Sequence, residues 1–175
     1  LICGLASLSS TAADMPHSLT LDQLQAQNGA VIDTRVSAFY NGWPQTLSGT
    51  SGHEPAALNL AAAWLSAMSD EQIALWAKQH QLTPATTIAL YGDENDNQAV
   101  KARLEKAGYR HVSLLSDALQ TPERLQRLPH FEQLVYPQWI HRLQQGKPVA
   151  AAPAGDWKVI EAAWGAPKFY LLNHI

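Results

Sequence analysis

Cysteine and charge are both scarce in this 175-residue chain, which has one cysteine, Cys3, and only 15% charged residues. A single thiol excludes a disulfide within the chain. The formal net charge of −3 provides no basic surface for nucleic acid or an anionic membrane. No apolar run approaches the roughly 20 residues that cross a bilayer. The 46% hydrophobic share instead predicts a globular protein, with room for one ordinary domain and part of another.

The first thirteen residues are all apolar or small. We interpret residues 1–13 as the remnant of a secretory signal, cleaved after Ala12 or Ala13. This interpretation predicts an exported, periplasmic protein that has no membrane association after cleavage and no thiol in its mature form. A plain N-terminal tail is the alternative.

The stretch from Thr86 to Leu115 organises the chain. A β-favouring apolar run at 87–91 predicts a buried strand, and residues 111–115 predict another. Between them, Asp96 or Asn97 is expected to cap a helix that ends near Gly108. In open α/β sheets, ligands and chemistry gather where such a strand runs into its helix, so the polar loop beginning at Gly92 is the place to look.

The segments before this stretch also predict alternating helices and strands. Capping boxes at Thr20–Gln23 and Ser69–Gln72 predict two further helices, and 30–33 predicts a buried strand. Residues 36–52 are rich in Gly, Pro and Ser and predict a long loop. A turn over 51–60 then leads into a short strand.

The C-terminal third begins the pattern again. Residues 117–133 are interpreted as a linker with one short helix, and 134–175 as the truncated start of a second unit. That second unit is expected to contain a strand at 134–136, a helix at 138–145, a strand at 157–163 and a turn at 173–175. The whole predicts an α/β fold, with 14–116 as the one complete domain.

Four features in this order resemble the rhodanese-like sulfurtransferase domain family. They are a strand that ends in Asp33-Thr34-Arg35, a turn Gly52-His53-x-Pro55-x-Ala57-x-Asn59, a strand that ends at Tyr91, and a helix that closes on Ala107-Gly108-Tyr109. The resemblance implies an open, mostly parallel sheet with helices on both faces. It also implies sulfur transfer from thiosulfate through a cysteine persulfide. The runs 39–44 and 155–165 further resemble the front of exported, multi-domain members, whose reactive cysteine lies in a later domain.

The position of the reactive cysteine in the family corresponds to Gly92, which has no side chain to act as a nucleophile. No Ser, Thr or Lys stands among the six positions of this degenerate loop, which are Gly92, Asp93, Glu94, Asn95, Asp96 and Asn97. An anionic donor about 5 Å from one carboxylate meets roughly 3 kcal/mol of repulsion at an effective dielectric near 20. A helix N-terminus offsets only about 0.3–1 kcal/mol of that.

Three other groups have structural explanations that we favour over functional ones. Asp33 and Arg35 are expected to stabilise a strand end through an ion pair, although they could orient a catalytic loop. His53 is expected to anchor a turn. The carboxylates of Asp93, Glu94 and Asp96 could hold Ca²⁺, but their spacing lacks the pattern of a known calcium loop. The seven histidines have no three- or four-residue spacing, so we expect no metal site and no cofactor.

The sequence thus favours the non-catalytic, N-terminal portion of a thiosulfate sulfurtransferase, with later rhodanese-like domains of the same polypeptide as its partners. The alternative is a stand-alone binding module that captures a cationic partner or a metal ion through residues 92–97. The loop around Trp43 is a candidate packing surface for a neighbouring domain, with packing inside its own domain as the default. The oligomeric state is not determined by the sequence.

Overall fold

A computed structural model describes residues 16–45, 49–147, 157–163 and 168–174. The predicted signal remnant at 1–13 lies outside these residues. Within them, no helix is long and apolar enough to pass through a lipid bilayer.

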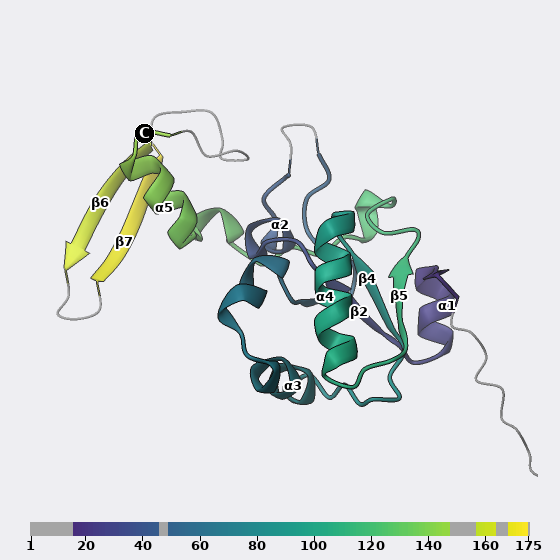
Figure 1. Cartoon of the computed structure of the whole chain (residues 1–175). Coiled ribbons are helices and arrows are strands. Elements are labelled where there is room, and N and C mark those ends of the chain that lie inside the picture. The colour runs from purple at the N-terminus through teal and green to yellow at the C-terminus, as the bar shows by residue number, and fades with distance from the viewer. Residues whose placement is uncertain (1–15, 46–48, 148–156, 164–167, 175) are drawn as a thin grey trace, which may run out of the picture.

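Five parallel strands form the central sheet, in the spatial order β1-β5-β4-β2-β3 (Figure 1). The three inner strands are β2 (Ala30–Asp33), β4 (Ile88–Tyr91) and β5 (Val112–Leu115). The edges are the two-residue strands β1 (Ser18–Leu19) and β3 (Leu58–Asn59). The predicted inner strands are confirmed to within a residue, whereas β1 has no counterpart in the sequence prediction because two residues give no periodic pattern.

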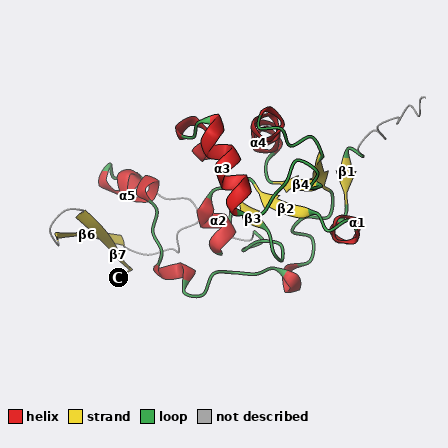
Figure 2. Cartoon of the chain, turned by 90° about the horizontal axis from the view of Figure 1, so that it is seen from below, coloured by secondary structure: helices red, strands yellow, loops and turns green. Residues whose placement is uncertain are grey.

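Helices cover both faces of the sheet, as the resemblance implies (Figure 2). On one face α1 (Leu21–Ala26) packs its two buried leucines against a cluster that includes Val31, Ala89 and Tyr91. Thr20 and Gln23 form the predicted capping box at its start. The alternation along β2 and β4 then turns Ile32, Ile88 and Leu90 to the opposite face.

The opposite face is covered by η1 (Ala62–Ala67), α3 (Asp70–Gln79) and α4 (Glu94–Lys106). The predicted capping box of Ser69 and Gln72 opens α3. Val100 and Leu104, four residues apart on one face of α4, are fully buried. Gly108 follows the end of α4 with φ 98°, a left-handed conformation that favours glycine.

The prediction of one long loop over 36–52 is wrong. Residues Ser37–Asn41 form the helix α2, which starts directly behind β2 and buries Ala38. Its five residues are too few to show helical periodicity in the sequence. Trp43 follows α2 and is only 3% exposed, so it belongs to the interior and does not form an exposed surface loop.

The predicted linker runs back along the first unit and contains two 3₁₀ turns, η2 (Pro122–Arg124) and η3 (Phe131–Gln133), where one short helix was predicted. Gln126 pairs with His53 in an isolated antiparallel bridge. The backbone N–H of Leu128 donates to the carbonyl of Asn41. These contacts bind residues 117–133 to the sheet unit.

The predicted helix at 138–145 is found as α5 (Pro137–Gln144), but residues 134–136 precede it without forming the predicted strand. Strands β6 (Trp157–Ala163) and β7 (Lys168–His174) form an antiparallel hairpin next to α5 and away from the five-stranded sheet (Figure 1). Asn173 and His174 therefore belong to a strand and not to the predicted turn, while Ile175 lies outside the described residues. The start of a second rhodanese-like unit stays a prediction.

Candidate functional site

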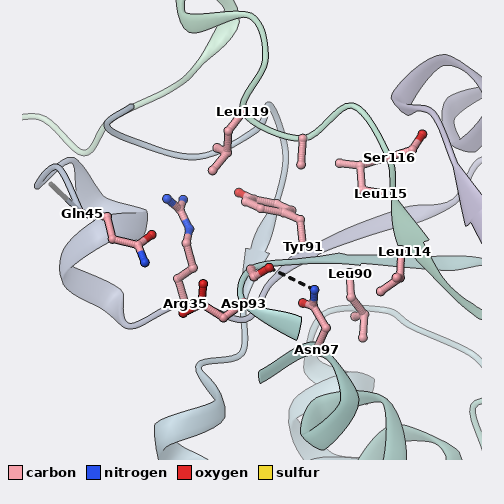
Figure 3. A pocket seen from close by; sticks show the side chains of 12 residues that line it. Arg35, Gln45, Leu90, Tyr91, Asp93, Asn97, Leu114, Leu115, Ser116 and Leu119 are labelled. Carbon is pink, nitrogen blue, oxygen red and sulfur yellow. Dashed lines mark hydrogen bonds between the residues drawn. The ribbon is translucent and has the colours of Figure 1, made fainter. Parts of the chain in front are cut away.

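A cavity of about 380 Å³ opens at the carboxyl ends of β2, β4 and β5 (Figure 3). It is the place where an open parallel sheet offers its ligand site. Arg35 and Tyr91 line it from the ends of β2 and β4, and Asp93 and Asn97 line it from the start of α4. Leucines from β5 and the segment behind it form the opposite wall.

Gly92, the position expected to lack a nucleophile, follows β4 with φ 149°, a conformation that L side chains rarely adopt. A Cβ atom built on this backbone would collide with Oγ1 of Thr34. The next heavy atom, Cγ of Arg35, lies 3.4 Å from the same point. The space that a nucleophilic side chain would need next to β4 is therefore occupied by Thr34, the residue that follows β2.

Thr34 closes this corner through a buried hydrogen-bond network. Its hydroxyl lies 3.1 Å from the carbonyl oxygen of Tyr91 and 2.9 Å from Oδ1 of Asn97, and its one proton is shared between these two acceptors. Asn97 Nδ2 in turn donates to the carbonyl of Gly92 at 3.1 Å. Thr34 is fully buried and Asn97 is 8% exposed, so this network holds the first turn of α4 against the ends of two strands.

Helix α4 begins earlier than predicted. Its N-cap residue is Asp93, and not Asp96 or Asn97, so four of the six loop positions lie inside the first turn of the helix. The carboxylate of Asp93 accepts no hydrogen bond from the helix, so this N-cap lacks the side-chain contact on which capping preferences rest. Burial, and then the charge of Asp93, raises the pKa of the Asp96 carboxyl.

Asp33 and Arg35 form a bidentate ion pair at the end of β2. The guanidinium donates from Nε to Oδ1 at 3.0 Å and from Nη2 to Oδ2 at 2.6 Å, and Nη2 also donates to the carbonyl of Gly52 at 2.7 Å. Burial lowers the pKa of Arg35, but the hydrogen bond and charge of Asp33 outweigh burial and raise it overall. The hydrogen bonds of the pair are committed to the strand end and the turn behind it.

Tyr91, the last residue of β4, presents its ring to the guanidinium of Arg35 at 5.4 Å (Figure 3). Its hydroxyl accepts from the backbone N–H of Glu54 at 3.1 Å. Burial, followed by the charge of Asp33, raises the pKa of this hydroxyl far above its ordinary value. Tyr91 is therefore neutral at any physiological pH and is not available as a base or a nucleophile.

His53 anchors its turn in two ways. Its ring stacks on that of Tyr40 at 3.9 Å, and its Nδ1 donates to the carbonyl of Tyr40 at 2.7 Å. Its backbone pairs with Gln126. Tyr40 completes the arrangement by donating its hydroxyl to the carbonyl of Ala57 at 2.6 Å. These contacts leave His53 outside the set of residues that line the cavity.

A buried carboxylate next to His53 escaped the sequence analysis. Glu54 is 0% exposed and accepts hydrogen bonds from Nε of Arg124 at 2.7 Å and from its Nη2 at 3.0 Å. The hydrogen bond with Glu54 raises the pKa of the Arg124 guanidinium. Seventy residues separate the two partners, so no local pattern could have paired them. Thr34 was likewise seen only as the middle of a strand-end motif.

A second cavity of about 380 Å³ adjoins the first and shares Gly92 and Asn97 with it. His17, Glu94 and Lys101 line it. Across the described parts of the chain, no three His, Cys, Asp or Glu side chains gather closely enough to hold a metal ion. Asp93, Glu94 and Asp96 instead spread along one helical turn, next to the positive end of the helix dipole.

Known proteins match nearly all of the chain in sequence and in backbone structure. The curated thiosulfate sulfurtransferase YnjE of Escherichia coli (strain K12) is 69% identical over 172 residues, which is 98% of this chain and 40% of the relative. A crystal structure of YnjE superposes with a TM-score of 0.75 and covers 91% of this chain and 38% of that one. This chain thus spans less than half the length of these relatives.

A more distant structure is the anaerobic ergothioneine biosynthesis enzyme from Chlorobium limicola, in complex with trimethyl histidine. It is 26% identical with a TM-score of 0.62, and the match covers 82% of this chain and 35% of that one. The family described as Rhodanese-like domain matches residues 18–121, well over half of the 175 residues. The chain belongs to the rhodanese-like domain family.

Proposed function

We propose that this chain is the non-catalytic, N-terminal rhodanese-like portion of an exported thiosulfate sulfurtransferase. In this proposal the persulfide forms on a cysteine of a later domain, and the present domain packs against or positions that domain. The 69% identity to a thiosulfate sulfurtransferase over 40% of its length supports a place in a longer protein of that kind.

The observation that carries the proposal is the identity of the residue at the carboxyl end of β4, which we call the sheet crest and where Gly92 stands. A sulfur carrier needs a thiolate there, and Gly92 supplies only backbone. The hydroxyl of Thr34 occupies the space next to it, and Tyr91 is held neutral. The hydroxyl of Thr34 is held by buried hydrogen bonds and that of Tyr91 stays protonated, so neither serves as a sulfur acceptor in place of a thiolate.

The charges at the start of α4 point the same way. Asp93 and Glu94 are exposed there, and Asp93 lines the cavity in which thiosulfate would sit. The one arginine of the cavity wall, Arg35, is already paired with Asp33. An anionic sulfur donor would therefore meet net negative charge as well as the absence of a nucleophile.

The direct test is a thiosulfate and cyanide assay of the 175-residue chain, with thiocyanate as the product that is measured and the E. coli relative as the positive control. We expect thiocyanate at the level of a heat-treated sample. Turnover that survives in a Cys3→Ala variant would overturn the proposal, because that variant contains no thiol. Turnover that disappears in Cys3→Ala would assign the activity to Cys3 and leave the crest silent, as proposed.

Mass spectrometry after incubation with thiosulfate adds a readout that does not depend on turnover. We expect the Cys3→Ala chain to keep its unmodified mass. A gain of one sulfur atom on any residue from 86 to 115 would contradict the proposal.

A further inference from the structure

A second hollow lies away from the sheet crest, between the first unit and helix α5. One wall is formed by residues 36–38 at the start of α2 and 63–64 of η1, and the other by residues 136–137 and 139 at the start of α5. Its volume is about 310 Å³. We call it the α2–η1 groove. Its place on the molecule makes it independent of the cavity next to Gly92.

The groove is apolar and uncharged. None of its lining residues is Asp, Glu, Lys, Arg or His, and only Ser37 among them has a short polar side chain. Val36 and Trp64 stay 40% and 38% exposed, which is unusual for two large hydrophobic side chains that line one hollow. Aromatic residues without charge are typical of the buried centre of a protein interface.

The groove continues an aromatic contact that already joins α5 to the first unit. Trp43 meets Trp139 edge to face, with ring centroids 5.2 Å apart, and Trp139 meets Tyr136 at 5.0 Å. Asn41 Nδ2 donates to the hydroxyl of Tyr136 at 2.9 Å. The start of α5 is thereby held in place next to α2, so any unit built around α5 must lie beside the groove.

We infer that the α2–η1 groove is the docking surface for a further rhodanese-like unit of the same polypeptide, with Trp64 as its central contact. This inference rests on the proposed function, because it needs a longer protein of which this chain is one part. The YnjE relative is long enough for such a unit, since the matched region is 40% of its length. The absence of charge in the groove argues against nucleic acid or an anionic lipid as the occupant.

The test uses the complete natural polypeptide that contains this sequence, with small-angle X-ray scattering as the measurement. We expect Trp64→Ser to shift the equilibrium between docked and undocked units by roughly thirtyfold, as removal of a hot-spot aromatic residue does. The radius of gyration would rise accordingly. Leu75→Ser is the matched control, because Leu75 is 54% exposed on α3 and lies outside the groove; it should leave the radius unchanged.

Val36→Ser, at the start of α2, is the second variant in case Trp64→Ser does not fold. A radius of gyration that is unchanged in both folded variants would overturn the inference, as would a natural polypeptide with no further rhodanese-like unit. Light scattering that shows a dimer dissociated by Trp64→Ser would replace it with a second copy as the occupant. Thiocyanate formation by Cys3→Ala would end the proposed silence of the crest without changing any of these scattering results.

Discussion

Two corners of the same sheet differ sharply in how their charges are used. At the end of β2, the carboxylate of Asp33 and the guanidinium of Arg35 are buried and fully paired. At the end of β4, Asp93 and Glu94 are exposed, and Asp93 does not cap its helix through its side chain. The first corner holds the fold together, whereas the second corner is the position at which the family resemblance predicts a reactive cysteine and this chain has Gly92.

The difference teaches that the framework and the chemistry of this fold are separable. The buried pair needs both partners, because a lone charge in its place would be expensive. The junction of β4 and α4 needs only to connect a strand to a helix, and Thr34 and Asn97 do this by hydrogen bonds. The architecture therefore does not depend on a side chain at Gly92.

The largest effect is expected from Asp33→Asn. This change leaves the guanidinium of Arg35 buried without its carboxylate, and breaking a buried pair in this way costs about 3–5 kcal/mol. Urea denaturation followed by circular dichroism would measure the loss in the free energy of unfolding. Asp22→Asn, an exposed aspartate in the first turn of α1, serves as the control and should cost at most about 1 kcal/mol. Equal costs for the two variants would remove the contrast between buried and exposed charge.

An intermediate effect is expected from Gly92→Cys in the Cys3→Ala background. The left-handed φ and the collision with Oγ1 of Thr34, the end of a short side chain, together cost about 2–4 kcal/mol. Gly108→Cys is the matched control, because φ there is 98° and nothing lies within 4 Å of the added Cβ. It should show the backbone cost alone in the same denaturation experiment.

The same Gly92→Cys variant sharpens the comparison on the side of function. We expect no thiocyanate from thiosulfate and cyanide, because Thr34 and the nearby carboxylates remain. Turnover by this variant would show that only a cysteine side chain is missing for catalysis and that the residues around position 92 still permit sulfur transfer.

The smallest effect concerns Asp96. Its pKa is raised in the folded state by burial and then by the charge of Asp93. A carboxyl with a raised folded pKa binds protons more readily when folded, so its charge destabilises the fold above that pKa, and the penalty fades as the pH falls. We expect Asp96→Asn to stabilise the chain at pH 7 by at most roughly 0.5 kcal/mol. The gain should vanish below the ordinary aspartate pKa of 3.8. Thermal unfolding at pH 7 and pH 3.5 would measure this, and a gain that persists at the lower pH would contradict it.

Much of the fold was open to prediction because its signals are local. Strands Ala30–Asp33 and Ile88–Tyr91 are short apolar runs between turn residues, and both capping boxes carry their partners three residues apart. The family resemblance rested on the order of such pieces. The absence of a nucleophilic side chain at Gly92 was equally predictable, since it follows from the identity of the residue alone.

The wrong predictions concern features that depend on contacts between distant parts of the chain or on elements too short for a local signal. Helix α2 is too short for a periodic signal. Helix α4 begins at Glu94, earlier than predicted, and Asn97 in its first turn is held by a tertiary hydrogen bond with Thr34. Trp43 was expected in a surface loop and is buried by rings from Phe131 and Trp139, which lie far along the chain. None of these neighbours is visible to an argument from adjacent residues.

The amino-acid sequence by itself determined the parallel α/β architecture and the absence of a nucleophile at position 92, because strand periodicity, capping boxes and residue identity are local properties. Only the tertiary structure decided that Thr34 fills the space beside Gly92 and that Glu54 pairs with Arg124. It alone also brought α2, η1 and α5 together around one apolar groove. Each of these depends on segments tens of residues apart, and their meeting is set by the packing of the whole sheet.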